Sequence, residues 1–441
     1  MRGQTNFRYY SFEPKTTGKE FMKPTTALSL AALFLAASLP ATAKVCDAHS
    51  YGAKPDGATK NTTAIQSAID DCAKAGGGTV QLSGGVFVSG PIVLKTNVTL
   101  DLAKGTTLLG SPDHADYPKK TEFRAPGTQS LVSATNAQNI AITGSGTIDG
   151  NGESWWEEAR KTHNAGVVGA VDFRPRLVVF DHCKHVKIEG VTIQNSPSWQ
   201  VVPYYTDDTV IRNVRILAPQ HSPNTDAIDP FSSSNMIIDH VYADVGDDNI
   251  AIKSGIINSP GPDAPSTNIT ITDCEFMHGH GLSIGSEIAG GANNIRAERI
   301  HFKGTDQALR IKANRDRGNQ VYNIVFKDIT MEEVKTSILI SEYYPKVLPE
   351  GDVAAAPITR LTPFFHDITI ENVKSVKSGT AAVIVGLPES PVKNLVLKNI
   401  NIAAEKGMTI AYANVSGSDV HVIAANGQPI TKGAAAEVNL K

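Results

Sequence analysis

Two adjacent carboxylates lie in the segment VGDDNIAIKSG, which spans residues 245 to 255. In a regular strand successive side chains point to opposite faces, so Asp247 and Asp248 could not both serve one site there. We therefore expect the chain to bend before the strand begins, with Gly246 permitting the bend and both carboxylates reaching one cleft. Clustered carboxylates raise the pKa of one group while another stays ionised, which acid/base chemistry requires.

Other groups with useful chemistry are Asp226 in HSPNTDAIDP, His280 in GHGLSIGSE, and Arg310 and Lys312 in RIK. Cleavage of a glycosidic bond needs a protonated acid at the leaving oxygen and an ionised base or nucleophile. A histidine can orient the acid or carry a proton, and arginine and lysine bind the carboxylate of an acidic sugar. Each residue alone is commonplace, and only their combination indicates a site.

The elements that must position these groups form a repeat, with apolar residues at the second, fourth and seventh positions of short segments. The second position falls at residues 186, 209, 236, 269, 295, 324, 368 and 395. Irregular steps of this size indicate one structural unit per repeat, and the alternating Val, Ile and Thr indicate strands. We predict an all-β fold, a parallel β-helix in which each coil buries its apolar face on the next. The alternative is an antiparallel β-sandwich, whose strands usually recur at about 8–12 residues.

This register brings the candidate residues towards one face. Asp247 lies eleven residues after position 236 and His280 eleven after position 269, so the two should stack about 4.8 Å apart. Asp226 and Arg310 lie at other distances from their repeats, and loop length must bring them into line.

One amphipathic helix is expected, in NTTAIQSAIDDCAKAGGG (residues 61–78), as a cap on the first coil. Its apolar residues follow helical spacing, the glycines end it, and Thr63 with Gln66 predicts a capping box. We expect no other helix in the mature chain.

The four cysteines are Cys46, Cys72, Cys183 and Cys274. They contain no CxxC pair, so zinc is not expected, and nothing else predicts a metal or cofactor. Cys46 and Cys72 could form a disulfide, whereas Cys274 occupies an apolar repeat position and should be a buried thiol.

Residues 22–43 have the layout of a secretory signal, with a lysine, an apolar run and an Ala-Thr-Ala ending. The apolar run is shorter than the roughly 20 residues that a membrane span needs. We predict secretion, to the medium or periplasm, and a single catalytic domain over residues 44–441. Residues 1–21 are expected to precede the true start at Met22. N-terminal sequencing of the exported protein should begin at Lys44, and earlier residues there would contradict this.

The formal net charge of −3 gives no overall field that favours nucleic acid or an anionic membrane, and we expect a monomer. Any anionic ligand must be held by local cations.

The four segments quoted above, in this order, resemble the signature segments of the polygalacturonases of glycoside hydrolase family 28. The resemblance implies a right-handed parallel β-helix that hydrolyses α-1,4 bonds between galacturonate units of pectin with inversion. It implies that Asp247 is the general acid, that Asp226 and Asp248 activate water, and that His280 supports catalysis.

Substrate binding is implied for Arg310, Lys312, Asn224 and one tyrosine of SEYYP, for which we favour Tyr343 over Tyr344. Ala227 departs from the glycine usual in the family but removes no chemical group. Insertions at residues 151–175 and 341–363 could wall the cleft, where closed ends would make an exo enzyme and an open groove an endo enzyme. The absence of an extra domain favours endo action.

Two rivals stay open. A pectate lyase would use carboxylate-bound calcium and an Arg or Lys base, but the acidic groups form no recognisable calcium loop and His280 would have no role. A non-catalytic carbohydrate-binding β-helix would need aromatic platforms, yet aromatic residues make up only 6% of the chain.

Overall fold

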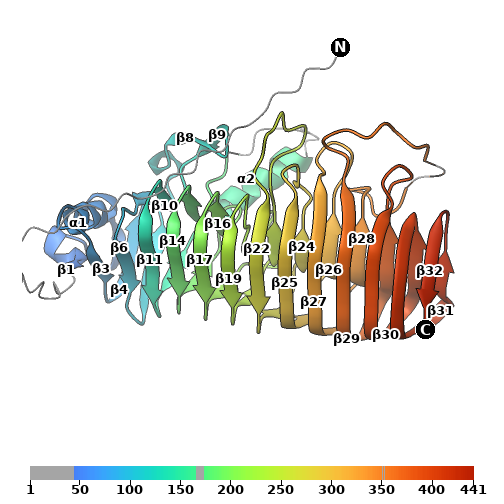
Figure 1. Ribbon diagram of the computed structural model, residues 1–441. Helices are drawn as coiled ribbons and strands as arrows, with labels where there is room; N and C mark the ends of the chain where they lie inside the picture. Colours follow the sequence, from blue (N-terminus) through green and yellow to red (C-terminus); the bar gives the residue numbers. More distant parts are fainter. Residues whose placement is uncertain (1–43, 165–172, 350, 352) are drawn as a thin grey trace, which may run out of the picture. The chain divides into compact units, whose positions relative to one another are not determined.

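The computed structural model describes residues 44–164, 173–349, 351 and 353–441. The predicted signal segment and the residues before it lie outside this range. Successive coils pair through parallel strands on three faces, so the chain forms the expected parallel β-helix (Figure 1). No helix in the described residues is both long enough and apolar enough to cross a membrane.

The three faces differ in which strands they contain. The first face has β1 (Lys44–Asp47), β3 (Gly78–Leu82), β6 (Val98–Leu102), β11 (Gln138–Gly144), β14 (Lys184–Glu189), β17 (Asp207–Arg212), β19 (Ser234–Asp239) and β22 (Ser266–Thr272). The second has β2 (Asp56–Lys60), β4 (Gly85–Ser89), β7 (Thr106–Gly110), β12 (Thr147–Asp149), β15 (Thr192–Gln194), β18 (Arg215–Leu217), β20 (Tyr242–Asp244) and β23 (Glu275–Phe276). The third has β5 (Ile92–Val93), β10 (Val132–Thr135), β13 (Val178–Asp181), β16 (Val201–Tyr204), β21 (Ile250–Ile252), β24 (Leu282–Ile284), β26 (Gln307–Lys312) and β28 (Thr336–Ser341).

In the later coils single long strands continue from one face to the next. These are β25 (Ala292–Lys303), β27 (Gln320–Glu332), β29 (Phe364–Val385), β30 (Val392–Ala411) and β31 (Ala413–Lys432), followed by β32 (Ala436–Leu440).

The predicted repeat register is confirmed, because all eight anchor residues pair with one another from coil to coil. In order they are Val186, Thr209, Met236, Ile269, Ile295, Ile324, Ile368 and Leu395. Each is at most 2% exposed and points into the core. The core also holds aromatic pairs such as Phe276 and Phe302, whose ring centroids lie 5.4 Å apart.

A ladder of asparagines runs along the start of the first face. Asn235, Asn268, Asn294 and Asn323 all have φ between 54° and 56°, a left-handed conformation that asparagine tolerates well. The side-chain Nδ2 of each later residue donates to the Oδ1 of the one before it. Asn235 in turn donates to Asp207 at 2.7 Å. The turn therefore repeats in geometry from coil to coil.

Helix α1 (Thr62–Lys74) covers the first coil as predicted, and a disulfide joins its Cys72 to Cys46. Cys183 and Cys274 are buried free thiols, as expected for Cys274. The predicted capping box is wrong: Asn61 is the N-cap residue and makes no side-chain cap bond. Gln66 instead bonds the backbone of Val93, because docking the helix on β5 takes both its amide groups.

The loops that precede third-face strands are long in the early coils. One contains the antiparallel hairpin of β8 (Lys119–Glu122) and β9 (Ala125–Thr128). The next contains helix α2 (Glu153–Asn164), so the expectation of a single helix is wrong. Its tryptophans explain why it forms, since Trp155 and Trp156 are buried and Trp156 Nε1 donates to Ser196 O at 2.9 Å. Figure 1 shows both insertions at the upper edge of the β-helix.

Core packing between coils yields a stability prediction. Phe302→Ala should lower the free energy of unfolding by about 3–5 kcal/mol, because it leaves a cavity beside Phe276. The measurement is unfolding in guanidinium chloride. Ile423→Ala, at a side chain that is 69% exposed, is the control and should change stability by less than about 0.5 kcal/mol. Equal effects of the two substitutions would contradict the packing argument.

Candidate active site

The predicted acidic residues lie in loops that enter neighbouring third-face strands. Asp247 and Asp248 precede β21, and His280 precedes β24. His280 N donates to Asp247 O at 2.9 Å, and Ala227 N donates to Asp248 O at 2.9 Å. These backbone bonds hold the three loops in register, so Asp226 is brought into line with the other two coils.

Asp247 and Asp248 both face one site, because the chain is irregular at residues 245–249 and β21 begins only at Ile250. One side-chain atom from each aspartate and one from His280 lie within 4.8 Å of one another. The reason for Gly246 differs from the expected one. A Cβ there would lie 2.3 Å from Ser222 O, so the glycine permits close packing of two loops.

Asp248 is an ionised carboxylate enclosed by cations. Lys312 Nζ lies 2.7 Å from its Oδ2, Arg310 Nη1 lies 3.4 Å from its Oδ1, and Ser283 Oγ donates to Oδ1 at 2.8 Å. Burial alone would raise the Asp248 pKa, but Lys312 and Arg310 outweigh burial and lower it. Asp248 therefore keeps its negative charge to lower pH than an ordinary aspartate does.

Asp226 lies in a second buried group that the sequence reasoning missed. Lys253 Nζ lies 3.6 Å from Asp226 Oδ2, 3.4 Å from Asp229 Oδ1 and 3.6 Å from Glu287 Oε2. Burial and the neighbouring Asp229 raise the Asp226 pKa, and burial raises the Asp229 pKa to about 7 despite Lys253. Two adjacent buried carboxyls do not both ionise readily, so this pair keeps a proton at neutral pH.

The sequence contains features from which Asp229 and Lys253 could have been predicted as site residues. Asp229 stands in the same segment as Asp226, and Lys253 lies two residues after Ala251, on the same side of the strand. A lysine at an outward position next to clustered acids is a candidate partner for them.

His280 bridges two acidic groups. Its Nδ1 lies 2.9 Å from Asp247 Oδ1, and its Nε2 lies 3.6 Å from Asp306 Oδ2. Burial opposes a positive charge on His280, but the hydrogen bond to Asp247 outweighs burial and raises the His280 pKa. The histidine can thus hold Asp247 in a fixed orientation and exchange a proton with it.

Tyr343, the predicted substrate contact, and Tyr344 lie in different surroundings. Tyr344 lies beside the cations, with its ring centroid 5.5 Å from Lys312 Nζ and 5.9 Å from Arg310 Cζ. Tyr343 packs instead against Leu339 in a separate apolar cluster. Both residues follow the end of β28, where strand alternation no longer predicts direction.

Asn224 is exposed, and its side chain accepts a hydrogen bond from Arg174 Nη2 at 2.7 Å. Ala227 is fully buried and does not have a positive φ, so alanine fits at this position without backbone strain.

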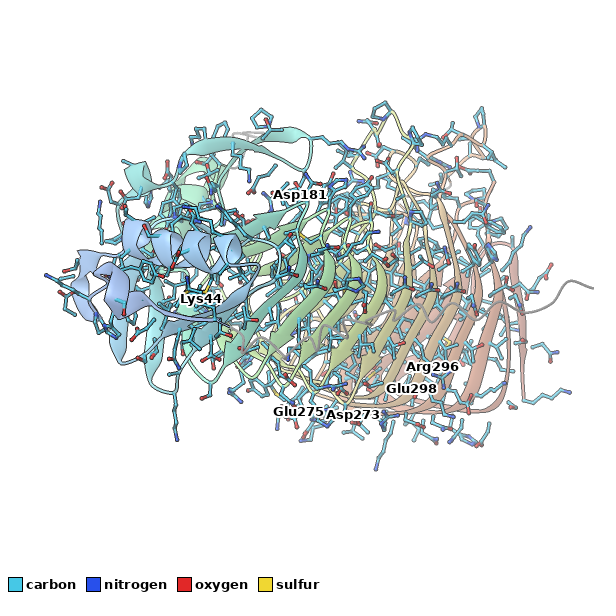
Figure 2. The ribbon with its side chains drawn as sticks, turned by 60° about the vertical axis from the view of Figure 1, so that its left-hand side comes forward. Lys44, Asp181, Asp273, Glu275, Arg296 and Glu298 are labelled. Atoms are coloured by element: carbon cyan, nitrogen blue, oxygen red, sulfur yellow. A yellow bond between two sulfur atoms is a disulfide. The ribbon has the colours of Figure 1, made fainter. Side chains whose placement is uncertain are left out.

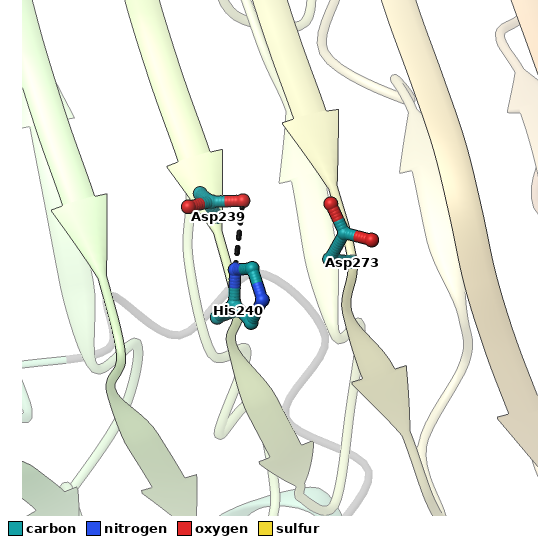
Figure 3. A group of neighbouring side chains, drawn as sticks. All are labelled: Asp239, His240 and Asp273. Atoms are coloured by element: carbon teal, nitrogen blue, oxygen red, sulfur yellow. Dashed lines mark ion pairs between the residues drawn. The ribbon is translucent and has the colours of Figure 1, made fainter.

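A second group of metal-ligand type, Asp239, His240 and Asp273, lies away from this site on the turn between the first and second faces (Figure 3). Its carboxylates are already engaged: Arg212 and Thr272 bind Asp239, and Arg299 binds both oxygens of Asp273. Figure 2 shows Asp273 with Glu275, Arg296 and Glu298 along this lower edge, where charged side chains of neighbouring coils meet. The group serves as a surface ion-pair network.

The first group, Asp247, Asp248 and His280, has a spacing that could accept a cation. A cation would have to share Asp248 with Lys312 and Arg310, which already neutralise that carboxylate. The donor set therefore fits proton transfer better than metal binding.

Acids of differing protonation state, a histidine and two cations on a parallel β-helix form a site suited to acid/base cleavage of a polysaccharide. The profile of "Glycosyl hydrolases family 28" matches residues 72–422, which include every site residue described above. The chain belongs to this family and is a glycoside hydrolase, which confirms the resemblance seen in the sequence.

Individual relatives agree with the family. The chain is 31% identical to "Probable polygalacturonase" of Vitis vinifera, covering 81% of this chain and 75% of that one. It is 31% identical to "Endo-polygalacturonase" of Pectobacterium carotovorum subsp. carotovorum, covering 82% and 89%. It also resembles the crystal structure of a hyperthermoactive exopolygalacturonase from Thermotoga maritima, with a TM-score of 0.75, 29% identity, and coverage of 88% and 93%.

The Lys253 group yields a pH prediction. Asp226 is expected to act in its ionised form, so kcat/KM falls as pH drops through its pKa. Lys253→Met removes a cation that lowers the Asp226 pKa, so the acid limb of kcat/KM should move to higher pH. Lys303→Met, which removes an exposed ion pair with Glu332 elsewhere, is the control. An unchanged acid limb in Lys253→Met would show that the lysine does not tune the catalytic carboxylates.

Proposed function

We propose that this protein is a polygalacturonase that hydrolyses the α-1,4 bonds between galacturonate units of pectin. The observation that carries the proposal is the pairing of ionised Asp248 with Arg310 and Lys312 in a site that also holds Asp247 and His280. Cations at this position suit a substrate that bears a carboxylate on each sugar. The names of the relatives point to the same substrate.

The acid and base roles follow from the contacts. Asp247, hydrogen-bonded to His280, is the proposed general acid, which protonates the leaving oxygen and is reprotonated through the imidazole. Asp248, which stays ionised, is the proposed base that takes a proton from the attacking water. Asp226 is the proposed second water-activating carboxylate, and it can act as a base only when the proton that the Asp226–Asp229 pair retains lies on Asp229.

Inversion remains a proposal that rests on the family resemblance. The nearest side-chain oxygens of Asp247 and Asp248 lie within 4.8 Å, which is closer than the roughly 6.5–9.5 Å usual between acid and base in inverting enzymes. Water would therefore have to enter from the side of Asp226. The anomer formed first, observed by proton NMR, distinguishes inversion from retention.

The protein is proposed to act outside the cell as a monomer, after removal of residues 22–43, because its polymeric substrate lies there. Tyr344 is the proposed tyrosine contact, with Arg310, Lys312 and Asn224, in place of Tyr343.

The function is tested by digestion of polygalacturonate with and without EDTA. New reducing ends without ultraviolet absorbance, equally fast in EDTA, are expected because proton transfer needs only side chains of the chain. Unsaturated products that disappear in EDTA would mean a calcium-dependent lyase, and the roles given to the aspartates would be withdrawn.

The acid role of Asp247 is tested by Asp247→Asn. Turnover should nearly disappear, because amide nitrogen cannot supply the proton, while the thermal midpoint should change little, since the side chain is only partly buried. Kinetics and melting curves measure the two effects. Asp244→Asn, at an aspartate paired with His278 outside the cleft, is the control. Substantial activity in Asp247→Asn would assign the acid role to another group.

A further inference from the structure

The β8–β9 hairpin packs against the third face, the face that carries the site residues. It belongs to the loop between β7 and β10, which enters the third face on the same side as Asp226. The loop of residues 253–265 follows β21 and leaves the third face on the opposite side. A contact between the hairpin and that loop therefore spans the third face.

The hairpin tip packs on the outer surface of the third face. The ring of Phe123 lies 4.6 Å from Tyr204 and 6.0 Å from Phe231, measured between centroids. Tyr204, Phe231 and Lys253 pair in register on consecutive coils. The tip therefore covers the coils that lie about 5 and 10 Å before Lys253 along the β-helix axis.

The same tip forms an ion pair with the loop of residues 253–265, on the opposite side of the third face. Arg124 Nη1 lies 3.1 Å from Asp263 Oδ1, and Arg124 Nη2 donates to the Tyr205 hydroxyl at 2.6 Å. Asp263 is only 3% exposed in its side chain and also accepts a hydrogen bond from Ser259, so it is a fixed anchor. The ion pair joins residues 139 positions apart in the sequence.

A chain of contacts links this bridge to the acidic residues. Lys253, which contacts Asp226, lies 4.8 Å from the centroid of Trp199, and that ring lies 6.2 Å from the ring of Phe123. Asp226 and the hairpin tip are therefore linked through only two intervening side chains, Lys253 and Trp199.

We propose that the Arg124–Asp263 bridge and Phe123 close one end of the cleft and make the enzyme exo-acting. A polymer cannot pass beneath the hairpin, so it binds with one chain end against the tip, and each cleavage releases a short product of fixed length. This inference rests on the proposed function and opposes the endo action expected from the sequence.

The test compares wild type with two variants, Arg124→Ala and a chain in which residues 119–128 are replaced by a two-residue turn. Arg299→Ala, which removes an arginine–aspartate pair on the far edge, is the control. Viscosity, reducing ends and product lengths are followed in one polygalacturonate digestion. Wild type and Arg299→Ala should release one product length from the first time point, with a slow fall in viscosity per bond cleaved. Both hairpin variants should give mixed lengths and a faster fall.

Different failures separate the two proposals. Mixed product lengths and a fast fall in viscosity with wild type would overturn the closed end while leaving the hydrolase proposal intact. Single-length products from the hairpin-shortened chain would also overturn it, because the tip would then not set the mode of attack. No new reducing ends from polygalacturonate with wild type would overturn the proposed function and this inference together.

Discussion

The hydrogen-bonded register between successive parallel strands is the constraint on which this protein depends. Neighbouring coils lie about 4.8 Å apart, so residues at equivalent positions come into contact even when 20 to 45 residues separate them in the chain. That spacing is what puts Asp247 beside His280, and Ser283 and Arg310 beside Asp248. The core stabilises the coils. The same spacing between coils brings the irregular loops before the third face together, so their acidic side chains lie close to one another.

The site concentrates charge that burial would otherwise disfavour. Asp226, Asp229 and Asp248 are all nearly inaccessible to solvent, and they persist because Lys253 and Lys312 are buried with them. Removal of one partner would leave a buried charge uncompensated, which is far costlier than loss of a surface ion pair. Such a site sets different proton affinities on chemically identical carboxyls, as acid/base cleavage requires.

Much of the fold could be predicted because strand repeats leave a local pattern: the parallel β-helix and all eight anchors were predicted correctly. Features that depend on long-range contacts could not be predicted in the same way. Tyr343 and Tyr344 follow a strand end, so only the folded loop determines which ring meets Arg310. Helix α2 depends on burial of its tryptophans under a distant coil. The Arg124–Asp263 bridge joins two loops whose sequences give no sign of one another.

The asparagine ladder has a direction. Each amide donates a hydrogen bond towards the N-terminal coil, and the run from Asn323 to Asn235 ends on the Asp207 carboxylate. An ionised carboxylate has no proton to donate, so it can only be an acceptor. The bond from Asn235 lowers the Asp207 pKa, so the two ends of the run support each other. Amide dipoles aligned in series polarise one another. One carboxylate therefore fixes the orientation of four side chains spread over four coils, as a terminal charge sets the polarity of a dipole chain.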